Sequence, residues 1–180
     1  MKPRLSGLIA LLLTVALGSA AFGQPRGLVI VVETTKGTFE FETYPGEAPL
    51  TVAHVVALVK DGFYDGQRIH RVVPGFVVQW GDPRSRDLSQ DGSWGSGAEA
   101  SSGSPIGAAE TSKLRTHTKG AVGIAHPGNP TLADSQIYIT LEDRPDLDRE
   151  YTVFGHIVRG DEVLATLERG DAIRKMYVKE

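Results

Sequence analysis

The hydrophobic and polar residues of this chain follow two different periods. From Thr38 to Thr43, phenylalanine alternates with glutamate and threonine, which is typical of a strand with one solvated face. The preceding segment, 28–34, is rich in β-branched residues, which favour strands. Because a Thr-Lys-Gly turn separates the two segments, they are predicted to form a hairpin.

A helical period follows this hairpin. Valines occur at positions 52, 55, 56 and 59, a spacing of i, i+3, i+4 and i+7 that places them on one face of a helix. Pro49 suits the first helical turn, and Gly62 suits the position just past the end. Since valine is a weak helix former, packing against a core must stabilise this helix.

The remainder of the chain returns mostly to strand patterns. Asp161 is predicted to cap a short second helix that ends at Gly170. Residues 81–119 are irregular and rich in Gly, Ser, Asp and Thr, although Trp94 and Ile106 mark parts that pack. Many strands with only two helices predict a closed β-barrel with helical plugs. The further strands are expected at 69–80 (a hairpin), 120–126, 135–140, 151–158 and 172–178.

The first 23 residues have the pattern of a secretory signal peptide. Lys2 and Arg4 precede an apolar run, and Ala21-Phe22-Gly23 offers small residues for cleavage before Gln24. An uncleaved membrane anchor is the alternative, but the apolar run is short for a membrane span. We therefore expect residues 24–180 to form one exported domain, either periplasmic or extracellular.

Charge and composition exclude several classes of function. Removal of residues 1–23 takes away two positive charges, so the formal net charge changes from −3 to −5. A mildly acidic protein is a poor candidate for nucleic-acid binding, which depends on basic surface. The chain contains no cysteine, which excludes a thiol nucleophile and cysteine-ligated zinc. At 180 residues we expect a monomer.

The segment from Ile69 to Asp82 carries the candidate chemistry. It reads as two short strands around a Pro-Gly bend, with Arg71 and Gln79 each four residues from Gly75. A hairpin at this bend would bring the cation and the amide opposite each other, close to Phe76. Such a site suits a neutral polar ligand and not nucleophilic attack, and it requires no metal or cofactor.

This segment resembles the signature of the cyclophilins, the cyclosporin-binding class of peptidyl-prolyl cis-trans isomerases. The resemblance continues in order through 48–64, 120–140, 147–155 and 160–170. It implies a mainly β fold, a closed eight-stranded antiparallel β-barrel capped by two α-helices. It also implies acceleration of X-Pro bond rotation in proline-containing peptides and in unfolded exported proteins.

Site residues follow from the same resemblance. Arg71, Phe76 and Gln79 are implied to be catalytic. The chain departs from the family at Tyr138, where phenylalanine is typical, and at Asp146, where cyclosporin-sensitive members carry tryptophan. We therefore expect weak cyclosporin binding. The implied substrate-binding residues are Val77, Ala125, His126, Gln136, Tyr138, Leu147 and Tyr151.

Other interpretations of these residues are less favoured. His70, His126 and Ser135 invite a serine-hydrolase hypothesis, but no nucleophile-elbow pattern is present. The five histidines lack metal-ligand spacing. A cyclophilin-like peptide-binding or holdase module with little isomerase activity is the main alternative, and a purely structural role would not need the arginine site.

Overall fold

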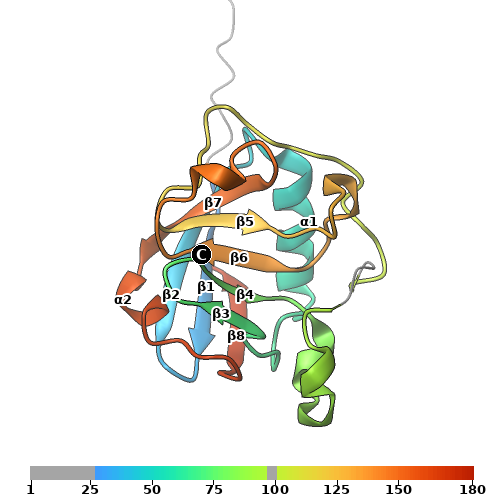
Figure 1. The fold of residues 1–180 in the computed structure, drawn as a ribbon, viewed down its shortest axis with the longest axis vertical. Coiled ribbons are helices and arrows are strands. Elements are labelled where there is room, and N and C mark those ends of the chain that lie inside the picture. Colours follow the sequence, from blue (N-terminus) through green and yellow to red (C-terminus); the bar gives the residue numbers. More distant parts are fainter. Residues whose placement is uncertain (1–26, 97–100) are drawn as a thin grey trace, which may run out of the picture.

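The computed structural model describes residues 27–96 and 101–180, so the predicted signal peptide at 1–23 lies outside the described residues. Eight antiparallel strands form one sheet in the order β3-β4-β6-β5-β7-β2-β1-β8 (Figure 1). The strands are β1 (Val29–Thr34), β2 (Thr38–Thr43), β3 (Arg71–Val73), β4 (Val77–Trp80), β5 (Ala121–Ile124), β6 (Ile137–Thr140), β7 (Thr152–Arg159) and β8 (Ile173–Val178).

The sheet curls into a half-barrel and does not close, so the predicted closed barrel is wrong. Closure would require β3 to pair with β8, but β3 has only three residues and pairs with β4 alone. The segment before β3 reaches the other edge through an isolated antiparallel bridge between Arg68 and Ala172. The prediction of eight antiparallel strands is confirmed.

Helix α1 (Pro49–Lys60) stands along one side of the curled sheet and packs against β8 (Figure 1). The helix begins at Pro49 as predicted, and its four periodic valines are all buried in the core. They join a cluster of large apolar side chains from the sheet that includes Phe39, Trp80 and Phe154. Within the described residues, no helix is both long and apolar enough to cross a membrane.

The N-terminus of α1 is capped from a distant loop. Ala48, the residue before the helix, makes no side-chain capping bond. Instead, the carboxylate of Glu110 accepts hydrogen bonds from the backbone N–H groups of Leu50 and Thr51, at 3.0 and 2.7 Å. The negative carboxylate also lies at the positive end of the helix dipole. This contact ties the 101–119 segment to α1.

Helix α2 (Asp161–Leu164) is a single turn that packs against β2. The prediction that Asp161 caps it is wrong, because Gly160 occupies the cap position with φ 76° and Asp161 is the first helical residue. A Cβ on residue 160 would lie 2.4 Å from the carbonyl oxygen of Thr38. The close approach to β2 therefore requires glycine, and a capping side chain is excluded there.

Parts of the long segment after β4 pack against the rest of the molecule, although many of its described residues are exposed. Two 3₁₀ helices, η1 (Pro83–Arg86) and η2 (Leu88–Ser93), follow the strand. Buried Asp82 accepts hydrogen bonds from the Arg84 side chain and from the backbone N–H of Gly95. Trp94 is 9% exposed, as the sequence indicated, and donates its indole N–H to a backbone carbonyl.

Candidate functional site

The β3–β4 hairpin positions the predicted arginine and glutamine. Arg71 and Gln79 are directly opposite each other in the register, as the spacing around Gly75 predicts. Gly75 has φ 68°, a conformation that glycine adopts without a steric cost. The turn is closed by a hydrogen bond of 2.9 Å from the Phe76 N–H to the Val73 carbonyl.

A chain of side-chain amides holds the arginine in place. Arg71 donates from Nη1 to Oε1 of Gln79 at 3.2 Å, and Gln79 donates from Nε2 to Oε1 of Gln136 at 2.9 Å. The Arg71 guanidinium carbon also lies 5.2 Å from the centre of the Phe76 ring. Because Arg71 is exposed, its remaining N–H donors are available to a ligand.

The predicted residues surround one cavity of about 190 Å³. All nine of its lining residues were implied by the resemblance, and the tenth predicted residue, Gln136, lines an adjoining cavity of about 220 Å³. The structure thus brings the ten side chains together, while their roles in catalysis and substrate binding stay predictions. The nine are Arg71, Phe76, Val77, Gln79, Ala125, His126, Tyr138, Leu147 and Tyr151.

Tyr138 has a partner that sequence reasoning missed. A hydroxyl in an apolar pocket needs a hydrogen-bond partner, and the structure supplies His117, whose Nε2 lies 2.8 Å from the Tyr138 oxygen. His117 lies in the irregular 81–119 segment, where no local pattern marks it, but its side chain is fully buried. Burial raises the pKa of the Tyr138 hydroxyl well above its usual value, so the hydroxyl stays protonated.

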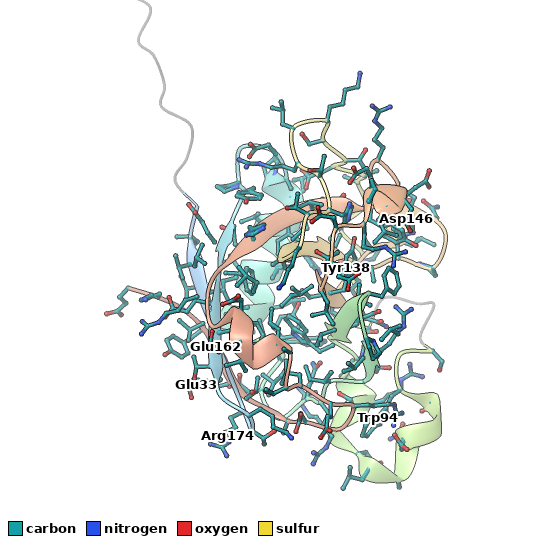
Figure 2. All side chains as sticks on the ribbon, turned by 60° about the vertical axis from the view of Figure 1, so that its left-hand side comes forward. Glu33, Trp94, Tyr138, Asp146, Glu162 and Arg174 are labelled. Carbon is teal, nitrogen blue, oxygen red and sulfur yellow. The ribbon has the colours of Figure 1, made fainter. Side chains whose placement is uncertain are left out.

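Two guanidinium groups contact Phe76, one of the three residues implied to be catalytic. The Arg144 guanidinium carbon lies 4.1 Å from the Phe76 ring centre, closer than that of Arg71. Asp146 orients Arg144 through two hydrogen bonds of 2.9 and 2.7 Å. Figure 2 places Asp146 at the surface, in keeping with its 56% exposed side chain. Asp146, which stands where cyclosporin-sensitive members carry tryptophan, therefore holds Arg144 against the ring of Phe76.

The aromatic rings of Tyr151 and His126 line the same cavity. They stack with their centres 4.3 Å apart, and Tyr138 meets Tyr151 edge to face at 6.0 Å. His126 is fixed further by a 3.0 Å contact between its Nε2 and the Glu150 carbonyl. These contacts form an ordered aromatic wall opposite the β3–β4 hairpin's arginine.

A buried carboxylate supports the adjoining cavity. Asp134 contacts Nε2 of His54 at 2.8 Å and accepts hydrogen bonds from the Ser102 N–H and hydroxyl. Burial raises the Asp134 pKa, but the bonds from His54 and Ser102 outweigh burial and hold it below its ordinary value. Asp134 stands two residues before Gln136, so this cluster fixes α1, the 101–119 segment and the glutamine together.

The site holds a fixed cation but no activated nucleophile. Ser135 is buried and donates its hydroxyl to the Gly81 carbonyl at 2.8 Å, while His126 faces a backbone carbonyl. These two residues therefore do not form the nucleophile–base pair that the hydrolase hypothesis requires. Across the described residues, no group of three or more histidine or acidic side chains is arranged to hold a metal ion.

Comparison with known proteins identifies relatives over almost the whole described chain. The profile of the family described as cyclophilin type peptidyl-prolyl cis-trans isomerase/CLD matches residues 29–179. Peptidyl-prolyl cis-trans isomerase B of Bacillus subtilis is 38% identical over 140 residues, covering 78% of this chain and 90% of the relative. A probable peptidyl-prolyl cis-trans isomerase of Brucella abortus is 33% identical, covering 91% of this chain and 83% of that protein.

Other relatives are longer, and solved structures share the fold. The chain spans 27% of the length of peptidyl-prolyl isomerase CWC27 of Cryptococcus neoformans, to which it is 35% identical over 79% of its own length. The crystal structure of a Cryptosporidium parvum cyclophilin superposes with a TM-score of 0.75 at 24% identity, covering 86% of this chain and 98% of that one. The chain therefore belongs to the cyclophilin-type peptidyl-prolyl cis-trans isomerases, a family of enzymes.

Proposed function

We propose that this chain accelerates rotation about X-Pro peptide bonds by stabilising the twisted amide with Arg71. The supporting observation is an exposed guanidinium, fixed by Gln79 and Gln136, at the rim of an apolar cavity. Amide resonance creates a rotation barrier of about 18–20 kcal/mol. No bond has to form for this rotation, so the reaction needs no nucleophile or cofactor.

The residues suit the electronic change during rotation. As the amide twists, the prolyl nitrogen becomes pyramidal and gains a lone pair, which accepts a hydrogen bond from the Arg71 fork. In either planar isomer this electron pair is delocalised into the carbonyl group and is a poor acceptor, so the interaction favours the transition state over both ground states. The proline ring lies against Phe76, Val77 and Leu147 while the preceding carbonyl rotates.

A second observation supports proline-containing peptides as the ligand class. A Cryptosporidium parvum cyclophilin with the same fold has been crystallised in the presence of the dipeptide Ala-Pro. The cavity of this chain, about 190 Å³, is lined by the apolar side chains of Phe76, Val77 and Leu147, which suit the ring of a proline residue. Proline-containing peptides are therefore the substrates that we assign to it.

Replacement of the arginine tests the proposal. In an isomerisation assay with a short Xaa-Pro peptide, Arg71→Ala is expected to lower kcat/KM by about 100- to 1000-fold, the range for one lost transition-state donor. Arg71→Lys keeps the charge but not the fork, so an intermediate loss is expected. Because Arg71 is exposed, both variants should fold, as circular dichroism would verify.

The same assay decides between catalysis and binding alone. If the wild type binds the peptide but does not accelerate isomerisation, the chain is a peptide-binding or holdase module. If Arg71→Ala accelerates isomerisation as well as the wild type does, the chain is an isomerase but the arginine mechanism is wrong. Activity should also be nearly constant from about pH 6 to 9, because arginine does not titrate there. A steep histidine-like change within this range would count against the arginine mechanism.

We further infer that the chain is exported and acts on exported proteins. The supporting observation is the basic, apolar and small-residue pattern of residues 1–23. Expression in a bacterium, cell fractionation and mass spectrometry of the recovered protein test this directly. A product beginning at Gln24 outside the cytoplasm is expected, whereas an intact Met1 in the cytoplasmic fraction would contradict export.

A further inference from the structure

The wall of the proline cavity is connected to a buried hydrogen-bond chain. Tyr138 is 4% exposed and its hydroxyl oxygen lies 2.8 Å from Nε2 of His117. On the other side of the imidazole ring, Nδ1 lies 2.9 Å from Oδ1 of Asp148, which also accepts the His117 backbone N–H at 2.8 Å. Figure 2 shows Tyr138 in the interior of the molecule, below the surface turn that carries Asp146.

The sheet is adapted to this placement of the tyrosine. Gly123 in β5 is the register partner of Tyr138 in β6. A Cβ on residue 123 would lie 2.2 Å from Cζ and 2.3 Å from the hydroxyl oxygen of Tyr138, far inside van der Waals contact. The absence of a side chain at Gly123 therefore makes the space through which the tyrosine reaches His117.

We propose that His117 is a positioning residue of the isomerase site, holding Tyr138 in the cavity wall so that peptide affinity depends on the Asp148–His117–Tyr138 chain. This inference rests on one part of the proposed function, namely that the cavity lined by Arg71, Phe76 and Tyr138 binds the proline residue of the peptide. Tyr138 lines this cavity together with Arg71 and Phe76, and it also supports Tyr151 edge to face. His117 has no contact with the cavity itself, so it acts through Tyr138.

The protons of the chain have a definite order. An ionised carboxylate only accepts, so Asp148 requires the proton of His117 on Nδ1, and Nε2 then accepts the Tyr138 hydroxyl proton. Burial lowers the pKa of His117 while Asp148 and Asp146 oppose this, and the net pKa is below the usual value. Neutral His117 is therefore the form present above about pH 6.5.

Protonation of His117 would reverse the contact with the tyrosine. Nε2 would become a donor to the Tyr138 oxygen, and the hydroxyl proton would have to turn away from His117, so the tyrosine would lose the hydrogen bond that it donates in the neutral form. The groups facing His117 are Tyr138 from β6, Asp146 and Asp148 from the η4 turn (η4, Pro145–Leu147) and the Arg144 backbone, which donates to the His117 carbonyl. We therefore expect weaker peptide binding in acid.

The kinetic signature differs from that of Arg71. The cavity wall contacts the proline ring in both planar isomers and in the twisted state, so loss of its order removes binding common to all three. His117→Ala should raise KM by about three- to tenfold and leave kcat within about twofold. His117→Gln places an amide oxygen near the Nε2 position, so it should keep KM within about twofold of wild type.

A double-mutant cycle separates positioning from general stability. Because Tyr138→Phe removes the hydroxyl, a His117→Ala change made in that background should alter KM by less than about twofold relative to Tyr138→Phe alone. An equal effect of His117→Ala in both backgrounds would overturn the inference, since His117 would then act independently of the tyrosine.

The pH profile provides a second test that does not need the alanine variant to fold. Wild-type KM should rise in acid, below the ordinary titration range of histidine, and His117→Gln, which cannot titrate, should lack this rise. Identical profiles for the two proteins would overturn the inference. Binding of an Ala-Pro peptide should also be measured directly, in the Arg71→Ala protein with and without the His117 substitutions. Peptide affinity can change between these proteins even if the arginine mechanism is wrong, so the two proposals are tested separately.

Discussion

The cap that Glu110 places on α1 allows a stability prediction that can be worked from the structure. Every N–H group in the first turn has an identified partner. Ala48 donates to Tyr44, Pro49 has no N–H, and Val52 donates to the Ala48 carbonyl at 2.9 Å. Only Leu50 and Thr51 remain, and both donate to the Glu110 carboxylate. Glu110→Ala therefore leaves two donors without their partner at the positive end of a twelve-residue helix.

The expected cost is about 1–2 kcal/mol of unfolding free energy. Loss of a helix N-cap typically costs about 0.5–2 kcal/mol, and an anion at a helix N-terminus contributes about 0.3–1 kcal/mol. The Leu50 donor is exposed, so water replaces part of the lost interaction and the upper extreme is not reached. With a urea m value of about 2 kcal/mol/M, the midpoint should fall by about 0.5–1 M.

Urea unfolding followed by circular dichroism measures this change. Glu110→Gln keeps one amide oxygen as an acceptor but loses the charge and the second acceptor, so its midpoint should fall between those of wild type and Glu110→Ala. Lys113→Ala is the matched control, since this exposed residue lies in the same segment and its change should stay within about 0.5 kcal/mol. Equal midpoints for Glu110→Ala and Lys113→Ala would refute the capping account.

Three further measurements test other parts of the structure. Burial lowers the pKa of His70 from 6.5 to about 4, so as the pH falls the unfolded chain binds a proton at His70 before the folded chain does. Up to about 3 kcal/mol of stability, fully present above pH 6.5, should therefore be lost as the pH falls to 4. Urea unfolding at several pH values measures this loss, which should be smaller in His70→Gln. A Cβ at Gly81 would lie 2.1 Å from the Ser135 carbonyl at φ 111°, so Gly81→Ala should cost about 3 kcal/mol or more, whereas Gly92→Ala, with open space around it, should unfold at the wild-type midpoint. Asp146→Trp should tighten cyclosporin binding in calorimetry by about tenfold or more, worth about 1.4 kcal/mol, and unchanged affinity would show that this position does not limit the ligand.

The local elements of the fold were predictable from sequence because their signals are short-range. The spacing of the four valines predicts α1, and the Pro-Gly sequence predicts the turn at Gly75, each from only a few neighbouring residues. The pairing of Arg71 with Gln79 follows because each lies four residues from Gly75. Closure of the barrel was not predictable in this way. It depends on whether β3 is long enough to reach β8, and pairing between elements about 100 residues apart leaves no local pattern.

The site shows the same division between motif and supporting contacts. The motif residues could be named from the sequence, but the groups that hold them could not. His117 meets Tyr138 from 21 residues away, and His54 meets Asp134 from 80 residues away. Arg144 is close to Phe76 only because the chain turns back after β6. A polar residue in an irregular segment gives no sign of which distant partner it will meet.

The open β8 edge of the half-barrel affects whether other polypeptide chains can add to the sheet. Unpaired strand edges invite extended chains to add to a sheet and seed aggregation, and the substrates proposed above are peptide chains. Two N–H groups on the outer side of β8 are already occupied, since Met176 donates to the Asp65 carboxylate at 2.9 Å and Ile173 donates to the Gln67 carbonyl at 2.8 Å. Exposed Arg174 and Lys175 add charge to the same strand. These bonds and charges therefore hinder the proposed peptide substrates from adding to the β8 edge of the sheet.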